Sequence, residues 1–242
     1  MITHILHKAI GTAAVLLCCA SCAEQCNIQG NSKVASLDGK LLYINMFDAQ
    51  NASVCVDSCE VIHGRFSFSP GVDSVVMVRL FTGGECIMPL VIEGGDLVVS
   101  VDHSGGRISG GVLNDRLDKF LQRRRRLDNR QWELDQKCMR MMYEGKSPAE
   151  VKKAVGKQAE KLRREMDRLE TQFIRDNYDN PLGPGMFVWL FSENPVPVMT
   201  PQIEEIVKDA PPAFLHHPEV SRYLRRAAAY RQIRMNVFPD DM

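Results

Sequence analysis

The chain lacks net charge, long apolar runs and the common catalytic motifs. Its 30 Lys and Arg residues balance 30 Asp and Glu residues, so the protein as a whole has no charge that favours nucleic acid. No segment approaches the roughly 20 consecutive apolar residues that a membrane-spanning helix needs. The motifs G-x-S-x-G and H-E-x-x-H, the P-loop and the dinucleotide fingerprint are also absent. We therefore expect a non-enzymatic protein with no cofactor, no metal site and no nucleic-acid partner.

The balanced charge is unevenly distributed along the chain. Residues 23–111 contain 5 Lys and Arg against 10 Asp and Glu, a net charge of −5, whereas residues 112–178 contain 18 against 12, a net charge of +6. Such asymmetry indicates two segments with different surfaces and different neighbours.

The N-terminus has the plan of a secretory signal peptide. A weakly basic start with His4, His7 and Lys8 precedes a short apolar run over residues 9–17, and small residues follow. This order of basic, apolar and small residues is typical of a peptide that is removed during secretion. We therefore assign residues 1–21 to a signal peptide.

Four of the eight cysteines lie at the end of this segment, at positions 18, 19, 22 and 26. The tetrapeptide Cys19-Ala20-Ser21-Cys22 resembles the lipobox of bacterial lipoproteins, although Cys19 stands where leucine is usual. The resemblance implies that Cys22 receives a diacylglyceryl group and becomes the first residue of the mature chain. A zinc site is the alternative, but the cluster has no nearby histidine and no second cysteine pair.

A lipidated Cys22 would place the protein in the cell envelope, anchored to the outer membrane, with the periplasmic face favoured over the cell surface. Disulfides persist in that compartment. Five cysteines then remain besides the anchor, and spacing alone does not assign their pairing. These are Cys26, Cys55, Cys59, Cys86 and Cys138.

After an expected anchor and linker over residues 22–39, residues 40–111 are typical of β structure. Arg65-Phe66-Ser67-Phe68 alternates with period two after the turn residues His63-Gly64, and Glu93-Gly94-Gly95-Asp96 resembles a hairpin turn. Short strands separated by turn residues, with no room for helices between them, predict an antiparallel β-sandwich or open barrel.

From residue 112 onward the apolar residues follow helical spacing. Gly145 interrupts the pattern, and Ser147-Pro148-Ala149-Glu150 restarts it with serine at N-cap, proline at N1 and glutamate at N3. We predict an α+β protein in which a long antiparallel helical hairpin follows the β domain and ends at Asn180-Pro181. Shorter helices are expected over 184–192, 201–208 and 218–234, within a helical region 112–242. The predicted seam of the second long helix consists of Val151, Val155, Ala159, Leu162, Met166, Leu169 and Phe173.

Three clusters suggest chemistry, and each has a simpler structural interpretation. The arginine run 123–126 cannot form one stripe because neighbouring helical residues point about 100° apart, so a solvated helix surface is expected, with anionic lipid or a partner as the alternative. His216-His217 is interpreted as the entry to a helix rather than as a metal site. Met139, Met141 and Met142, near Trp132, are expected to fill a core.

Among the five cysteines that remain besides the anchor, Cys55 and Cys59 are the only close pair. A redox pair usually has the spacing C-x-x-C at a helix N-terminus, where the first thiol has a lowered pKa. Here the spacing is C-x₃-C between strand-like runs, and Asp57 would raise the thiol pKa. A structural or unpaired role is therefore favoured, and a redox or disulfide role remains the alternative.

The strand region also resembles a known domain. Residues 56–68, the segment 89–99 and Ile108-Ser109-Gly110-Gly111-Val112-Leu113-Asn114 are similar to an uncharacterised domain at the N-terminus of envelope thioredoxin-like lipoproteins of the AhpC/TSA and TlpA/ResA type. In those relatives a thioredoxin-like domain follows. The resemblance implies an accessory module here, without the catalytic residues of that domain.

Together these observations predict a lipid-anchored binding or scaffold module with an envelope protein as partner, and the family resemblance suggests a partner of the thioredoxin-like class. Thiol–disulfide exchange through Cys55 and Cys59 is the second hypothesis. The third is a carbohydrate- or lipid-binding module, which would need exposed aromatic residues on the sheet. The candidates for that surface are Tyr43, Phe47, Phe66, Phe68 and Phe81.

Overall fold

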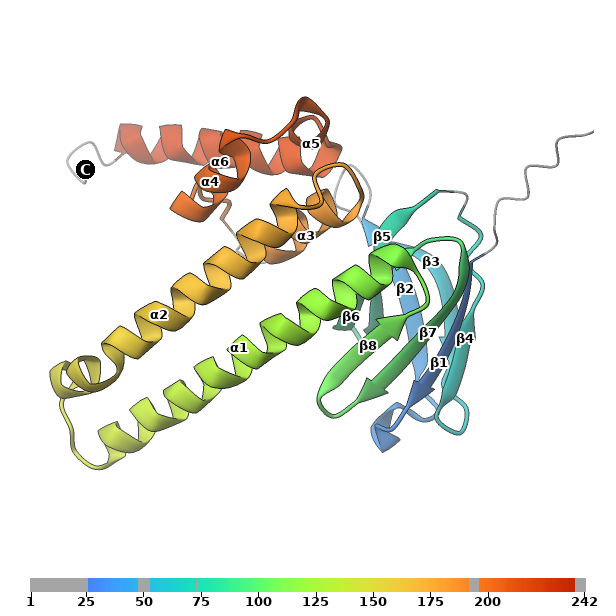
Figure 1. Cartoon of the computed structure of the whole chain (residues 1–242), viewed down its shortest axis with the longest axis horizontal. Coiled ribbons are helices and arrows are strands. Elements are labelled where there is room, and N and C mark those ends of the chain that lie inside the picture. The colour runs from blue at the N-terminus through green and yellow to red at the C-terminus, as the bar shows by residue number, and fades with distance from the viewer. Residues whose placement is uncertain (1–25, 48–52, 73, 192–195, 238–242) are drawn as a thin grey trace, which may run out of the picture.

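The computed structural model describes residues 26–47, 53–72, 74–191 and 196–237. It has the predicted α+β class: a β-sandwich stands at one end, and a long helical hairpin extends away from it (Figure 1). Shorter helices pack beside the end of the hairpin that is nearer the sandwich. The signal peptide and Cys22 lie outside the described residues.

The sandwich consists of two four-stranded sheets. One has the order β4-β1-β7-β8 and the other the order β3-β2-β5-β6. Apolar side chains from both sheets form the core, among them Ile28, Leu42 and Leu97. The strands are β1 (Cys26–Ser32), β2 (Leu41–Phe47), β3 (Ser53–Glu60), β4 (Arg65–Phe68), β5 (Val76–Thr82), β6 (Glu85–Ile92), β7 (Gly95–Asp102) and β8 (Gly105–Ser109).

The β domain begins at Cys26 and not at residue 40, so the predicted linker 22–39 is corrected. Strand β1 pairs with β4 in antiparallel and with β7 in parallel orientation, whereas the sequence predicts only antiparallel neighbours. The sequence CNIQGNS does not predict a strand, because only Cys26 and Ile28 supply buried apolar side chains. Hydrogen bonds from two neighbouring strands stabilise this polar segment in place of apolar burial.

The turn Glu93-Gly94-Gly95-Asp96 is not a hairpin. Strand β6 before it pairs with β5, while strand β7 after it pairs with β1 and β8. The segment therefore crosses from one sheet to the other, and Gly95 adopts a φ of +96°, which favours glycine. The local sequence predicts the turn, but it does not predict with which strands the segments before and after the turn will pair.

The predicted helical hairpin is present. Helix α1 (Val112–Tyr143) and helix α2 (Pro148–Arg175) enclose a turn in which Gly145 has a φ of +82°. The Ser147 side chain accepts a hydrogen bond from the Glu150 N–H at 3.4 Å, and Glu150 Oε2 accepts one from the Ser147 N–H at 2.9 Å, which confirms the capping box. The remaining helices are α3 (Leu182–Phe191), α4 (Pro201–Lys208), the short α5 (Pro212–Leu215) and α6 (Pro218–Val237).

The distal part of the hairpin has a small core of its own. Leu134, Val151 and Val155 are buried there, with Met141 and Cys138 packed against them. The predicted core role of the other methionines is wrong: Met139 and Met142 are exposed, as is Trp132 with 64% of its surface accessible. No helix in the described part of the chain is long and apolar enough to span a bilayer.

The β domain caps the first turn of α1. The carboxylate of Glu93, in the crossing between the sheets, accepts hydrogen bonds from the N–H groups of Leu113 at 3.1 Å and Asn114 at 2.7 Å. The buried Asn114 amide in turn accepts from Val91 N–H at 2.9 Å and donates to Val91 C=O at 2.8 Å. A Cβ at Gly111 would lie 2.2 Å from Glu93 Oε1, so glycine is required for this approach.

This cap predicts the effect of the substitution Asn114→Ala. The change leaves the Val91 N–H and C=O groups buried without partners, which we expect to lower the free energy of unfolding by about 2–3 kcal/mol. Chemical denaturation followed by circular dichroism measures the loss. As a control, Gln136→Ala at an exposed position of the same helix should change stability by less than about 0.5 kcal/mol. Equal effects of the two substitutions would contradict the role of Asn114.

Candidate functional site: a basic groove on the helical hairpin

A groove of about 880 Å³ runs between α1 and α2. Six cationic side chains line it, and all of them are exposed. They are Arg116, Lys119, Arg123, Arg126 and Arg130 of α1 and Arg168 of α2. Six of the 18 Lys and Arg residues of the segment 112–178 therefore line one surface of the hairpin.

Helix geometry explains why the five α1 cations share one side. They follow one another in steps of three, four, three and four residues, and residues three or four apart are neighbours on a helix surface. From Arg116 to Arg130 the helix rises by about 21 Å. This pattern is present in the sequence, but it overlaps the arginine run 123–126, in which consecutive cations obscure the spacing.

The four consecutive arginines separate into two pairs, which confirms that they form no single stripe. Arg123 and Arg126 line the groove. Arg124 pairs with Glu170 at 3.0 Å and lies 5.3 Å from the centre of the Trp189 ring. Arg125 donates a hydrogen bond to the Gly106 carbonyl at 2.9 Å. The expectation of a simply solvated surface is therefore corrected, because two of these side chains fix α1 to its neighbours.

The floor of the groove is apolar. Phe120 of α1 and Phe173 of α2 are buried and stack with their ring centres 4.2 Å apart. Leu127 and Leu169 are half-buried and extend the floor toward the distal end. A ligand in the groove would therefore meet apolar side chains beneath a row of cations.

Several of the cations have no ion-pair partner within the described residues. Arg130 pairs with Glu165 at 2.7 Å, and Arg116 donates to Asn177 Oδ1 at 2.7 Å. No carboxylate of the described residues lies within ion-pair distance of the other four. These four are Lys119, Arg123, Arg126 and Arg168. Such unpaired charges make the groove a candidate site for an anionic partner.

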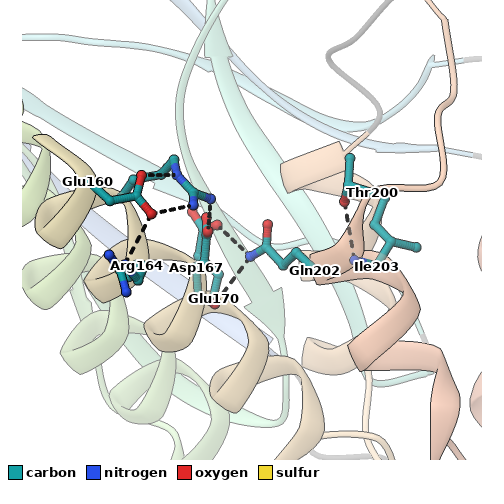
Figure 2. A network of polar contacts seen from close by, with 8 residues as sticks. Glu160, Arg164, Asp167, Glu170, Thr200, Gln202 and Ile203 are labelled. Carbon is teal, nitrogen blue, oxygen red and sulfur yellow. Dashed lines mark hydrogen bonds and ion pairs between the residues drawn. The ribbon is translucent and has the colours of Figure 1, made fainter. Parts of the chain in front are cut away.

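A polar network holds α2 in position. Gln202 of α4 donates to Glu170 Oε2 and to the Asp167 carbonyl of α2, both at 3.2 Å (Figure 2). Burial raises the pKa of Glu170, although the hydrogen bonds from Arg124 and Gln202 oppose this shift. Glu170 and Arg124 face away from the groove lining, so we assign this cluster to the packing of α2 rather than to ligand binding.

The predicted thiol pair does not come together. Cys55 and Cys59 lie on the same strand, β3, and four residues of extended chain place their Cα atoms about 13 Å apart. A disulfide requires Cα atoms within about 7 Å of each other. Cys55 is exposed, whereas Cys59 packs against the core. Burial raises the pKa of Cys59 to about 11, with a further increase from Asp57.

A second hollow, of about 410 Å³, lies where β5 meets the helical region, and His217 lines it. Burial lowers the pKa of His217, so the imidazole is neutral at pH 7, and no hydrogen bond to its Nδ1 is formed by the described residues. Within the described ranges no three His, Cys, Asp or Glu side chains gather as a metal site. The described residues that line this hollow include no Ser, Thr or Cys side chain to serve as a nucleophile.

Comparison with known families finds a match over the β domain. A DUF4369 domain spans residues 26–117. The family model is described as a domain of unknown function, and it covers all eight strands together with Glu93 and Asn114. Of the groove cations, only Arg116 falls inside the match. No curated protein and no solved structure matches the chain.

The thiol geometry predicts selective alkylation. With a pKa of about 11, Cys59 holds only about one thiolate per thousand molecules at pH 8, and its side chain is half-buried. We expect iodoacetamide to modify exposed Cys55 at least about tenfold faster than Cys59 in the folded protein. Peptide mass spectrometry measures both rates, and unfolding in denaturant should abolish the difference. Rapid alkylation of Cys59 at pH 8 would revive the redox hypothesis.

Proposed function

We propose that this protein is a non-enzymatic, lipid-anchored module of the cell envelope that binds a partner through the basic groove of its helical hairpin. The exposed cation row over an apolar floor carries the proposal, because clustered like charges create a positive potential that attracts an anionic partner. Four of these cations find no carboxylate partner in the described part of the chain. A protein that binds a partner and holds it at the membrane acts as a scaffold.

The lipobox resemblance at Cys22 supports localisation in the cell envelope. Cys26, where β1 begins, lies four positions after Cys22, and the chain between their Cα atoms spans at most about 14 Å. A lipid at Cys22 would therefore keep the β domain close to the bilayer. The resemblance to the accessory domain of thioredoxin-like lipoproteins supports a thioredoxin-like protein as one partner of the scaffold.

Two alternative functions receive less support. Thiol–disulfide exchange by Cys55 and Cys59 would require strand β3 to break before the two sulfurs could meet. A carbohydrate-binding sheet would need exposed aromatic rings, but Phe66 and Phe68 are buried and Tyr43 and Phe81 are half-buried. The fifth candidate side chain, Phe47, lies outside the described side chains.

Lipidation predicts where the protein is found. Cys22→Ser removes the acceptor sulfur, so we expect the variant to leave the membrane fraction. The wild-type protein should begin at a diacylglyceryl-modified Cys22, which intact mass analysis of the purified native protein detects. A native protein that retains Met1 and an unmodified Cys22 would contradict the anchor.

Partner binding is tested by photocrosslinking in the native envelope. A photoreactive amino acid at Lys119, inside the groove, should give one dominant crosslinked species. The same amino acid at Lys152, exposed on α2 outside the groove lining, provides the matched control and should give little of it. Identical crosslinks from both positions, or none from Lys119, would count against the groove as the binding site.

A further inference from the structure

We infer that the occupant of the basic groove is an acidic amphipathic α-helix of a partner protein. This inference rests on the proposed function and specifies the chemistry of the partner. The groove lies between two antiparallel helices, so a third helix laid in it would complete a three-helix arrangement. The distance of about 21 Å from Arg116 to Arg130 corresponds to a helix of about 14 residues, or four turns.

The two rims of the groove carry different charges. The α1 rim is positive throughout, with five cations in steps of three and four residues. The α2 rim is mixed, because Arg168 stands between Glu165 and Asp176. A helix with glutamates or aspartates at the same three- and four-residue steps would place an acid opposite each of Lys119, Arg123 and Arg126, the α1 cations that have no ion-pair partner in the described part of the chain. The other flank of that helix would need few acids.

This layout favours a helix over a membrane surface. A bilayer presents negative charge to both rims alike. Asp176 at the α2 rim, which has no ion-pair partner among the described residues, would repel it. The apolar side chains at the floor lie beneath the rims, where a flat surface cannot reach them. A helix with apolar residues between its acids can contact Leu127 and Leu169 while its acids pair with Arg123 and Arg126.

Binding of a designed helical peptide tests the inference. The probe is a fluorescent 16-residue peptide with leucines on one side and glutamates flanking them at three- and four-residue steps. Its control is the same peptide with lysine at every glutamate position. Fluorescence anisotropy with the full chain should show binding of the acidic peptide alone, and raising the salt concentration should weaken that binding.

Two matched double variants locate the site. Arg123→Glu with Arg126→Glu reverses two groove charges, and we expect it to weaken peptide binding at least about tenfold. Lys152→Glu with Lys153→Glu makes the same charge change at exposed positions outside the groove, and it should weaken binding less than about twofold. Circular dichroism of both variants verifies that the hairpin remains folded. Equal losses from the two variants would overturn the assignment to the groove.

Vesicles of phosphatidylcholine with and without phosphatidylglycerol test whether anionic lipid, rather than a helix, binds in the groove. Binding of the chain to the anionic vesicles through Arg123 and Arg126, without peptide binding, would replace the helix by lipid. A groove crosslink at Lys119 to a partner protein, combined with failure of the acidic peptide, would leave the proposed function intact and overturn only the helical occupant. Loss of both the crosslink and peptide binding would overturn both proposals.

Discussion

The hydrogen bonds between the β domain and the start of α1 determine the geometry of the rest of the molecule. Glu93 caps the helix, and the Asn114 amide satisfies the outward N–H and C=O groups of Val91. Further along the helix, Asp118 binds Arg107 at 2.8 Å and Arg125 reaches the Gly106 carbonyl. Because these contacts recur over more than three turns, they fix both the direction and the rotation of α1, and hence the side on which its cations lie.

The proximal half of α1 therefore has three distinct sides. Asn114, Asp118 and Arg125 contact the β domain, while Leu117 and Leu121 enter the main core. The cations at steps of three and four residues are left on the third side, toward the groove. Helix α2 is placed by the Phe120–Phe173 stack and by Gln202 of α4. The groove is thus a product of rigid packing around it, and a preorganised site loses little entropy when a partner binds.

Sequence patterns predict structural features that depend on neighbouring residues, and they fail for features that depend on contacts between residues far apart in the chain. The capping box at Ser147, the glycine turn at Gly145 and helix α4 are confirmed because their residues interact within a few positions. Strand β1 and the sheet-to-sheet crossing at Glu93 depend on partners far away in the chain. The three- and four-residue spacing of the groove cations was available in the sequence, but only the position of α2 turns that row into a groove. The exposure of Trp132 likewise depends on how far the hairpin extends beyond the main core.

The proposed binding site implies that the basic groove is occupied in the cell envelope. Arginine footprinting with phenylglyoxal, read by mass spectrometry, compares native envelopes with detergent-purified protein. We expect Arg123 and Arg126 to react more slowly in envelopes, whereas exposed Arg65 and Arg140, outside the groove, react equally in both preparations. Equal reactivity of Arg123 and Arg126 in the two preparations would show an empty groove and contradict the proposed binding site.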